Sequence, residues 1–397
     1  MSLVYSLSAA GFAATAISYG PARMGFGLFV PEFRAAFPMS TPAVGFISSL
    51  GFLGFFVALL LAQALLSRRG PAAPVLTGLV AATAGMGVVA LAPNLPALAA
   101  GVVLAAASAG FAWTPFNDAV HRTVRDVARP TALSRISTGT SLGIAAAGLA
   151  ALGMSLMGFS WRLCWTFFAI AGALALICNR AALRQVGRAP SPARRHCWRA
   201  FLHRAALPLF AIGFVFGTIS AIYLSFAADH LVTAGGVPGV PAAATPALVF
   251  IAYGMFGLAG LATGRAKKVI GLPWLLRLLM LAGAVSAAIL AILPGSWAGM
   301  IASAGLQGVH VMMTSAVLAF WSERLFPAFP SLGFTATLLA VAAGSVTGPA
   351  LAGIAADTFG AGAMFLGTAA LPAAIAVALR DRHAQERPVR AEAAALA

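Results

Sequence analysis

Long apolar runs separated by short polar breaks are the main pattern along this chain. Each run has about 20 residues, the length that an α-helix needs to cross the hydrocarbon core of a bilayer. Proline and glycine in the breaks at 92–96 and 293–296 allow one helix to end and the next to begin. The pattern predicts twelve membrane-spanning helices, at about 6–30, 43–66, 73–92, 95–117, 132–157, 162–180, 206–228, 245–264, 272–293, 297–320, 331–352 and 360–380.

Composition agrees with a membrane location. Of the 397 residues, 61% are hydrophobic and only 9% are charged. A soluble domain carries about 25% charged residues, so this chain has too few to cover a surface that faces water. We therefore expect an all-α integral membrane protein.

The basic residues predict how the chain is oriented in the membrane. If both termini are cytoplasmic, nearly all of the 25 lysines and arginines fall in or beside cytoplasmic loops, as the positive-inside rule requires. Only Arg34 and Arg162 then lie near outer loops, and Arg23 lies within the membrane. This topology explains the net charge of +16, with attraction to anionic membrane lipid as a secondary effect. We expect a multi-pass protein of the bacterial inner membrane, with no nucleic-acid partner.

The chain divides into two halves of similar design. An arginine-rich polar segment, 181–205, is expected to be a cytoplasmic linker between an N-terminal six-helix bundle, 1–180, and a C-terminal six-helix bundle, 206–380. A short cytoplasmic tail, 381–397, follows. Such duplicated halves are common in transporters, where pseudo-two-fold symmetry relates the two bundles.

A glycine pattern supports the duplication. Three glycines of the fifth span recur in the eleventh span at a constant offset of 205 residues. Small residues four apart let helix backbones approach closely, and tight packing of two helices is the simplest role for each glycine taken singly. The matched residues are Gly139, Gly143 and Gly148 in the fifth span and Gly344, Gly348 and Gly353 in the eleventh.

These features resemble the major facilitator superfamily over essentially the whole chain. Residues 65–70 look like a degenerate form of that family's Gly-x-Leu-x-Asp-Arg-x-Gly-Arg signature: Arg68 and Gly70 match it, and Ser67 replaces the aspartate. The run from Gly344 to Gly353, with Pro349, is similar to a signature that drug antiporters carry in the fifth span, although here it lies in the eleventh. The first span also resembles the YbfB-like branch. The resemblance implies a transporter that alternates access by rocking two bundles, with gating roles for Arg68, Gly70, Gly344, Gly348 and Pro349.

Arg23 is the best pointer to what the protein handles. It stands alone in an apolar span, with no second charge until Glu32. A charge at membrane depth costs about 2.5–3.5 kcal/mol on insertion scales, so a retained one usually faces a cavity and meets a partner or a substrate. A structural ion pair to Glu32 or Asp229 is the alternative. Pro21 and neighbouring glycines are expected to loosen this helix.

Other polar residues on apolar spans are candidates for lining a substrate site. In the tenth span Gln307, His310 and Thr314 recur three and four residues apart along one stripe. Histidine can also serve as an interhelical hydrogen-bonding group without a substrate role. The predicted substrate-binding residues are Tyr19, Arg23, Trp113, Asn117, Tyr223, Tyr253, Gln307, His310 and Thr314. Asp118, His121 and Arg122, where the fourth span ends, are predicted to belong to a cytoplasmic gate.

The predicted substrate is a small organic anion, because an unpaired arginine attracts and orients carboxylate, sulfonate or phosphate groups. No acidic residue lies securely in the middle of a span, so a coupled proton would use His310 or a residue at a membrane end, namely Glu32, Asp118 or Asp229. Transport without ion coupling is also open, and uptake and efflux are not distinguished.

Two other functions stay open. The first is a proton-coupled efflux pump for drugs or sugars, and the second is a non-transporting receptor or assembly factor on the same scaffold. Enzymatic activity is not expected, because Gly139-x-Ser141-x-Gly143 lies inside an apolar helix rather than at a strand-to-helix turn. The three cysteines form no Cys-x-x-Cys pair, so we expect no metal and no cofactor. The expected assembly is a monomer.

Overall fold

The computed structural model describes residues 3–184, 186, 206–327 and 330–384. The predicted linker 181–205 lies outside the described residues except for 181–184 and 186, and so does the predicted tail beyond residue 384. The described residues are organised as α-helices with short π-helical and 3-10 turns, which confirms the predicted all-α fold.

The first half of the chain contains the helices up to α9. They are α1 (Leu3–Ile17), α2 (Arg23–Leu28), α3 (Val30–Ala36), α4 (Thr41–Arg69), α5 (Ala72–Leu91), α6 (Leu95–Ala107), α7 (Trp113–Thr123), α8 (Arg129–Leu156) and α9 (Trp161–Leu183). The second half contains α10 (Leu207–Thr233), α11 (Thr245–Gly257), α12 (Thr263–Ile270), α13 (Leu272–Ile292), α14 (Trp297–Leu325), α15 (Pro330–Phe359) and α16 (Ala361–Ala378).

Eleven segments among the described residues are long and apolar enough to cross a membrane. They correspond to the second to twelfth predicted spans, and several extend further than predicted; the tenth, for example, runs to Leu325 rather than 320. Polar and charged residues continue these helices beyond the apolar core, so hydropathy alone underestimates their length.

The first predicted span, 6–30, is present but broken. A π-helical turn over Ser18–Ala22 separates α1 from α2. Pro21 has no backbone N–H and cannot make the hydrogen bond that an α-helix would place there, which accounts for the local change of winding. The turn also lies against α8, because a Cβ added at Gly20 would lie 2.5 Å from the Gly143 carbonyl oxygen. The expected loosening of this helix therefore falls directly before Arg23.

Several helices that begin at the same end of the molecule share one local signal. A serine or asparagine precedes each, and its side chain accepts a hydrogen bond from a backbone N–H of the first turn. Such caps satisfy donors that the helix itself leaves unpaired. The capping residues are Ser40 for α4, Asn94 for α6, Ser160 for α9 and Ser296 for α14.

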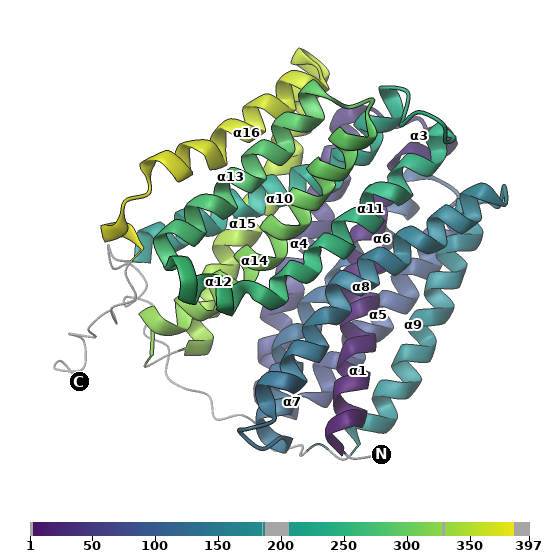
Figure 1. The fold of residues 1–397 in the computed structure, drawn as a ribbon. Helices are drawn as coiled ribbons and strands as arrows, with labels where there is room; N and C mark the ends of the chain where they lie inside the picture. The colour runs from purple at the N-terminus through teal and green to yellow at the C-terminus, as the bar shows by residue number, and fades with distance from the viewer. Residues whose placement is uncertain (1–2, 185, 187–205, 328–329, 385–397) are drawn as a thin grey trace.

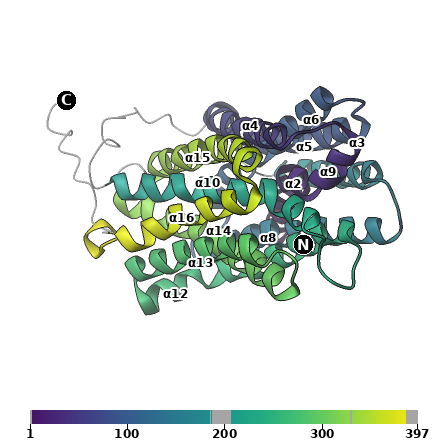
Figure 2. The same ribbon diagram turned by 90° about the horizontal axis from the view of Figure 1, so that it is seen from above.

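The helices form two groups, α1 to α9 and α10 to α16 (Figures 1 and 2). The most extensive contacts between the groups are those of α4 with α15 and of α8 with α11, and α2 and α3 also contact α10. In Figure 2 α4 and α15 lie side by side where the groups meet. The two long helix pairs thus flank a space between the groups that is available for a site.

The repeated glycines make equivalent contacts in the two groups. Gly143 approaches Ala16 of α1, and its counterpart Gly348 approaches Thr218 of α10, so both pack against the first long helix of their own group. A Cβ added at Gly148 would lie 2.8 Å from the Ala247 carbonyl oxygen of α11, and one at Gly353 would lie 3.0 Å from that of Thr41 of α4. Each of these glycines thus packs against the other group, as a two-fold relation requires.

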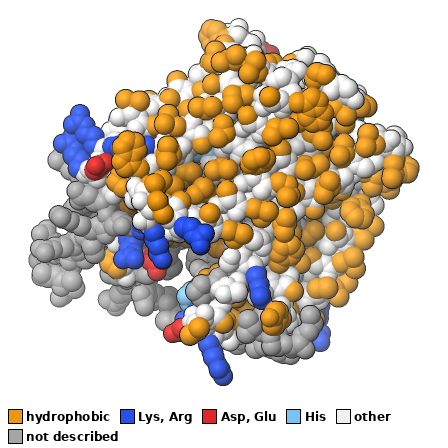
Figure 3. Space-filling view, viewed as in Figure 1, with side chains coloured by type: hydrophobic (Ala, Val, Ile, Leu, Met, Phe, Trp, Pro, Cys, Tyr) orange, Lys and Arg blue, Asp and Glu red, His pale blue; other side chains and the backbone are white. Residues whose placement is uncertain are grey.

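The two ends of the molecule differ in charge. Basic side chains gather where α4 ends and along α12, at Arg68, Arg69, Lys267 and Lys268, and we call this the basic end. Figure 3 shows basic residues along the left and lower parts of the surface. We call the end that carries α3 the opposite end (Figure 1). The surface between them is mainly hydrophobic in Figure 3, as expected for a surface in contact with lipid.

Candidate functional site

A cavity of about 310 Å³ lies between the two groups of helices. Side chains of both halves of the chain line it, from α4, α7 and α8 on one side and α10, α14 and α15 on the other. This volume falls within the range of small-molecule sites. The cavity is therefore the candidate binding site.

Arg23 is the one charged side chain among the described residues that line the cavity. Its guanidinium carbon lies 4.0 Å from the centre of the Phe55 ring and 5.5 Å from the centres of the Tyr19 and Phe52 rings. Its buried Nε atom has no hydrogen-bond partner in the described part of the chain. Aromatic faces stabilise a cation without neutralising it, so Arg23 keeps its charge available for a ligand.

Neither Glu32 nor Asp229, the two alternative ion-pair partners, forms an ion pair with Arg23 in the structure. Asp229 of α10 pairs with Arg34 of α3, with 3.2 Å between Oδ2 and Nε. Glu32 forms no ion pair with Arg23, and its Oε2 atom is buried without a partner within the described residues. The structural ion pair therefore does not explain why an arginine is kept at this depth.

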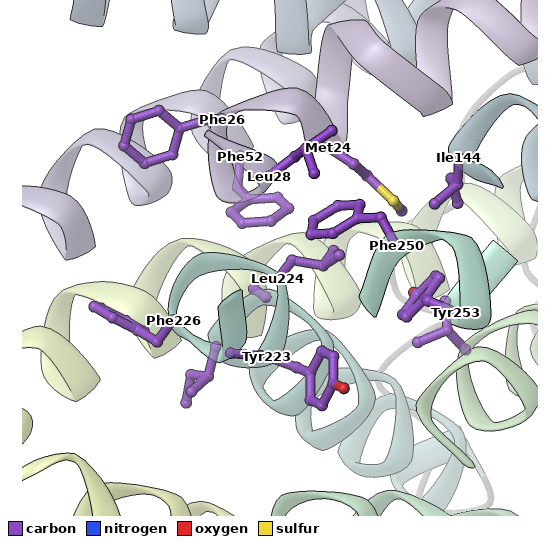
Figure 4. Close-up of a cluster of buried hydrophobic side chains, with 14 of the residues drawn as sticks. Met24, Phe26, Leu28, Phe52, Ile144, Tyr223, Leu224, Phe226, Phe250 and Tyr253 are labelled. Atoms are coloured by element: carbon purple, nitrogen blue, oxygen red, sulfur yellow. The ribbon is translucent and has the colours of Figure 1, made fainter. Parts of the chain in front are cut away.

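The two groups of helices are in tight contact beyond Arg23, at the opposite end. A Cβ added at Gly27 would overlap the Leu224 carbonyl oxygen of α10, and one at Gly45 would overlap the Pro349 carbonyl oxygen of α15. Figure 4 shows Met24 beside Phe250 in this region, above Leu224. The ion pair between α3 and α10 lies further along the same path. The cavity is thus closed at the opposite end.

Towards the basic end the groups separate. The cavity continues past Ser137 of α8, Leu261 and Ala319 to Phe334 of α15. Figure 3 shows the surface hollowed at this end, with basic side chains near the hollow. Arg23 therefore lies at the inner end of a cavity that extends towards the basic end.

The predicted substrate residues fall into three places. Tyr19, Arg23 and Trp113 line the cavity. Asn117 lies one turn after Trp113 on α7, and its Oδ1 atom is buried without a hydrogen-bond partner among the described residues. The remaining residues, Tyr223, Tyr253, Gln307, His310 and Thr314, are buried among the helices of the second group and are not part of the cavity lining.

In these five buried residues of the second group, some polar side-chain atoms have hydrogen-bond partners and others have none among the described residues. The Tyr223 hydroxyl is 3.2 Å from the Ser303 hydroxyl, and His310 Nδ1 donates to the Leu279 carbonyl oxygen at 2.7 Å. Both polar atoms of the Gln307 side chain, with His310 Nε2, Tyr253 Oη and Thr314 Oγ1, have no partner among the described residues. Their substrate role remains a prediction.

The predicted gating residues lie at the basic end and in α15. Asp118 and Arg122 form an ion pair on α7 with 2.5 Å between Oδ2 and Nε, and the His121 carbonyl accepts a hydrogen bond from Arg129 at 2.8 Å. Gly70 ends α4 with a φ of 73°, a conformation that glycine adopts at no steric cost. The gating role of these residues and of Arg68, Gly344, Gly348 and Pro349 remains a prediction.

Sequence reasoning did not single out Phe52 and Phe55, although they hold the guanidinium. The sequence does contain a signal for them, since two aromatic residues three apart on the second span share one helix face. What the sequence lacked was the information that this face points to Arg23. The pair of Arg34 and Asp229 was also missed, because its partners lie in different halves of the chain.

An all-helical membrane fold with a cavity between two related groups of helices is the architecture of a membrane transporter. The sequence profile of the Major Facilitator Superfamily matches residues 4–268. The chain belongs to this family and is a membrane transporter rather than an enzyme. No curated protein sequence matches it significantly.

Solved structures show the same fold at low sequence identity. A variant of the nucleoside transporter NupG matches with a TM-score of 0.76 at 11% identity, over 95% of this chain and 99% of that one. A bacterial homologue of the human lysosomal transporter Spinster, in an inward-facing and unoccupied conformation, matches with a TM-score of 0.75 at 15% identity, over 97% of this chain and 98% of that one. A peptide transporter, POT, in complex with sulfate matches with a TM-score of 0.78 at 15% identity, over 95% and 93%.

Proposed function

We propose that this transporter carries a small organic anion, which binds in the central cavity against Arg23. The observation that carries the proposal is a buried guanidinium that lines the cavity, stacks on Phe55 and has no ion-pair partner among the described residues. A forked guanidinium matches the two oxygens of a carboxylate or sulfonate. A drug cation would meet the same fixed charge and be repelled.

The proposed orientation places the basic end in the cytoplasm of a bacterial inner membrane, with both termini on that side. The cavity would then open to the cytoplasm and be closed towards the outside. Transport would require the contacts of Gly27, Gly45 and the Arg34 and Asp229 pair to separate while the basic end closes. The direction of net transport would follow the gradients of the substrate and of any coupled ion.

The proposal predicts a selective thermal response of the purified protein. Small carboxylates and sulfonates are expected to raise the melting temperature, because a ligand at a hundred times its Kd stabilises the folded state by about 2.7 kcal/mol. Sugars and lipophilic cations are expected to have no effect. The measurement is a thermal unfolding series with a panel of such compounds at matched ionic strength. Stabilisation by lipophilic cations alone would replace this proposal with drug efflux.

One observation favours proton coupling at the opposite end. Glu32 lies in α3, beyond the apolar run of the first span, and burial raises the pKa of its carboxyl group to about 7. Cys164 of α9 is a titratable neighbour, and Arg34 of α3 is directed to Asp229 instead. A carboxyl group with this pKa can take up and release a proton near neutral pH.

We expect the transport rate to change between about pH 6 and pH 8 as Glu32 loses its proton. Replacement of Glu32 by glutamine keeps the shape and the neutral form, so the rate should become independent of pH in this interval. The measurement is counterflow into proteoliposomes, with equal pH on both sides, for any anion found in the thermal series. A pH profile identical to that of the unmodified protein would exclude Glu32 as the coupling group.

A further inference from the structure

The cavity lining combines one charge with a mainly apolar wall. Among its described lining residues there is no second cation and no carboxylate beside Arg23. Large apolar side chains cover the wall from Arg23 towards the basic end, including Phe216, Leu261, Met312 and Phe334. A second charge placed along this apolar wall would meet no oppositely charged side chain there, which is costly.

Many of the hydroxyl groups in the lining are already bonded to their own helices. Ser137 donates to the Ser134 carbonyl at 2.9 Å, and Thr138 donates to the Arg135 carbonyl at 2.7 Å. The same holds on the other side of the cavity, where Ser315, Thr337 and Ser345 each donate to a carbonyl of their own helix at 2.9 Å. These groups have used their single donor, so they cannot donate to a second anionic group of a ligand.

The charge and the apolar wall are also separated along the cavity. Arg23 lies at the closed inner end, next to the contact between Gly27 and Leu224. The apolar wall extends from there towards the basic end. A ligand that uses both would place its head at Arg23 and its body along Phe216 and Phe334.

We propose that the substrate is an amphipathic monoanion, with a single carboxylate or sulfonate head on an apolar body of several carbon atoms. This inference rests on the proposed function and narrows it, since it excludes polar dicarboxylates, sugar phosphates and inorganic anions. A two-carbon anion would fill little of a 310 Å³ cavity and would bury little apolar surface. Affinity therefore comes from the body as well as from the head.

The test is a series of ligands that vary the head and the body separately. Acetate, butyrate, hexanoate and octanoate vary the body, octanamide removes the charge, and suberate adds a second carboxylate at the same length. Binding is measured by isothermal titration to the full-length protein in lipid nanodiscs, below the micelle concentration of each ligand. Empty nanodiscs correct for partition into lipid.

The expected result is a rise in affinity of about fourfold for each added methylene group until the body fills the cavity. Octanamide and suberate should bind at least about tenfold more weakly than octanoate. In Arg23→Gln the difference between octanoate and octanamide should disappear. In Phe334→Ser the increase with chain length should become smaller while the preference for the charged head is retained.

The outcomes separate this inference from the proposed function. Equal affinity of acetate and octanoate, or tighter binding of suberate than of octanoate, would overturn the amphipathic substrate and leave an anion transporter. Equal binding of octanoate and octanamide by the unmodified protein would overturn both, because the charge of the ligand would then have no role.

Discussion

Replacing Arg23 by alanine is expected to reduce the affinity for the transported anion by at least about thirtyfold. Truncation of one partner of a buried charge pair costs about 2–5 kcal/mol, and the described lining offers no second cation to compensate. Arg23→Lys should give an intermediate loss, since it keeps the charge and loses the planar fork. The measurement is titration of the anion that stabilises the unmodified protein most.

Arg162→Ala is the matched control. Arg162 also stacks on an aromatic ring, with 4.4 Å to the centre of Trp161, but it is not part of the cavity lining. The Arg162→Ala substitution should leave the affinity for the anion unchanged. The melting temperature of empty Arg23→Ala should not fall, because an unpaired buried charge is removed. Unchanged anion affinity in a folded Arg23→Ala protein would refute the arginine-centred site.

Replacing Gly27 by valine is expected to prevent closure at the opposite end. A Cβ at this position overlaps the Leu224 carbonyl oxygen, and a backbone atom cannot move aside as a flexible side chain can. Overpacking of about 3 kcal/mol or more in this one state shifts a two-state equilibrium by more than a hundredfold. We therefore expect transport to stop while the two groups of helices remain folded.

The measurement is the labelling of a cysteine placed at Ser225, which is buried beside the Gly27 contact. In a cysteine-free background a membrane-impermeant maleimide should label Ser225→Cys at least about tenfold faster when Gly27 is valine. Gly87→Val in α5 is the control, because a Cβ there would have no atom of the described residues within 4 Å. Equal labelling rates of Ser225→Cys with and without Gly27→Val would show that Gly27 does not hold this end closed.

The positions of the helices could be predicted well from the sequence, whereas the composition of the site could not. The length and hydropathy of a segment decide whether it can cross a bilayer, so eleven of the spans could be placed from local composition. The break in the first span was signalled by Pro21. The stripe of Gln307, His310 and Thr314 was found by helical periodicity, but periodicity does not say which neighbour a face meets, and these side chains are buried within their own group.

By itself the sequence determined the membrane location, the positions of most spans, the repeated glycine pattern and the isolated charge at residue 23, since each depends on local composition or spacing. Only the tertiary structure decided what surrounds that charge. It brought Phe52 and Phe55 over the guanidinium, paired Asp229 with Arg34 and closed one end of the cavity. These contacts join different helices, within the first group for Phe52 and Phe55 and between the two groups for Asp229 and Arg34. They depend on how the helices pack against one another rather than on the preferences of any single helix.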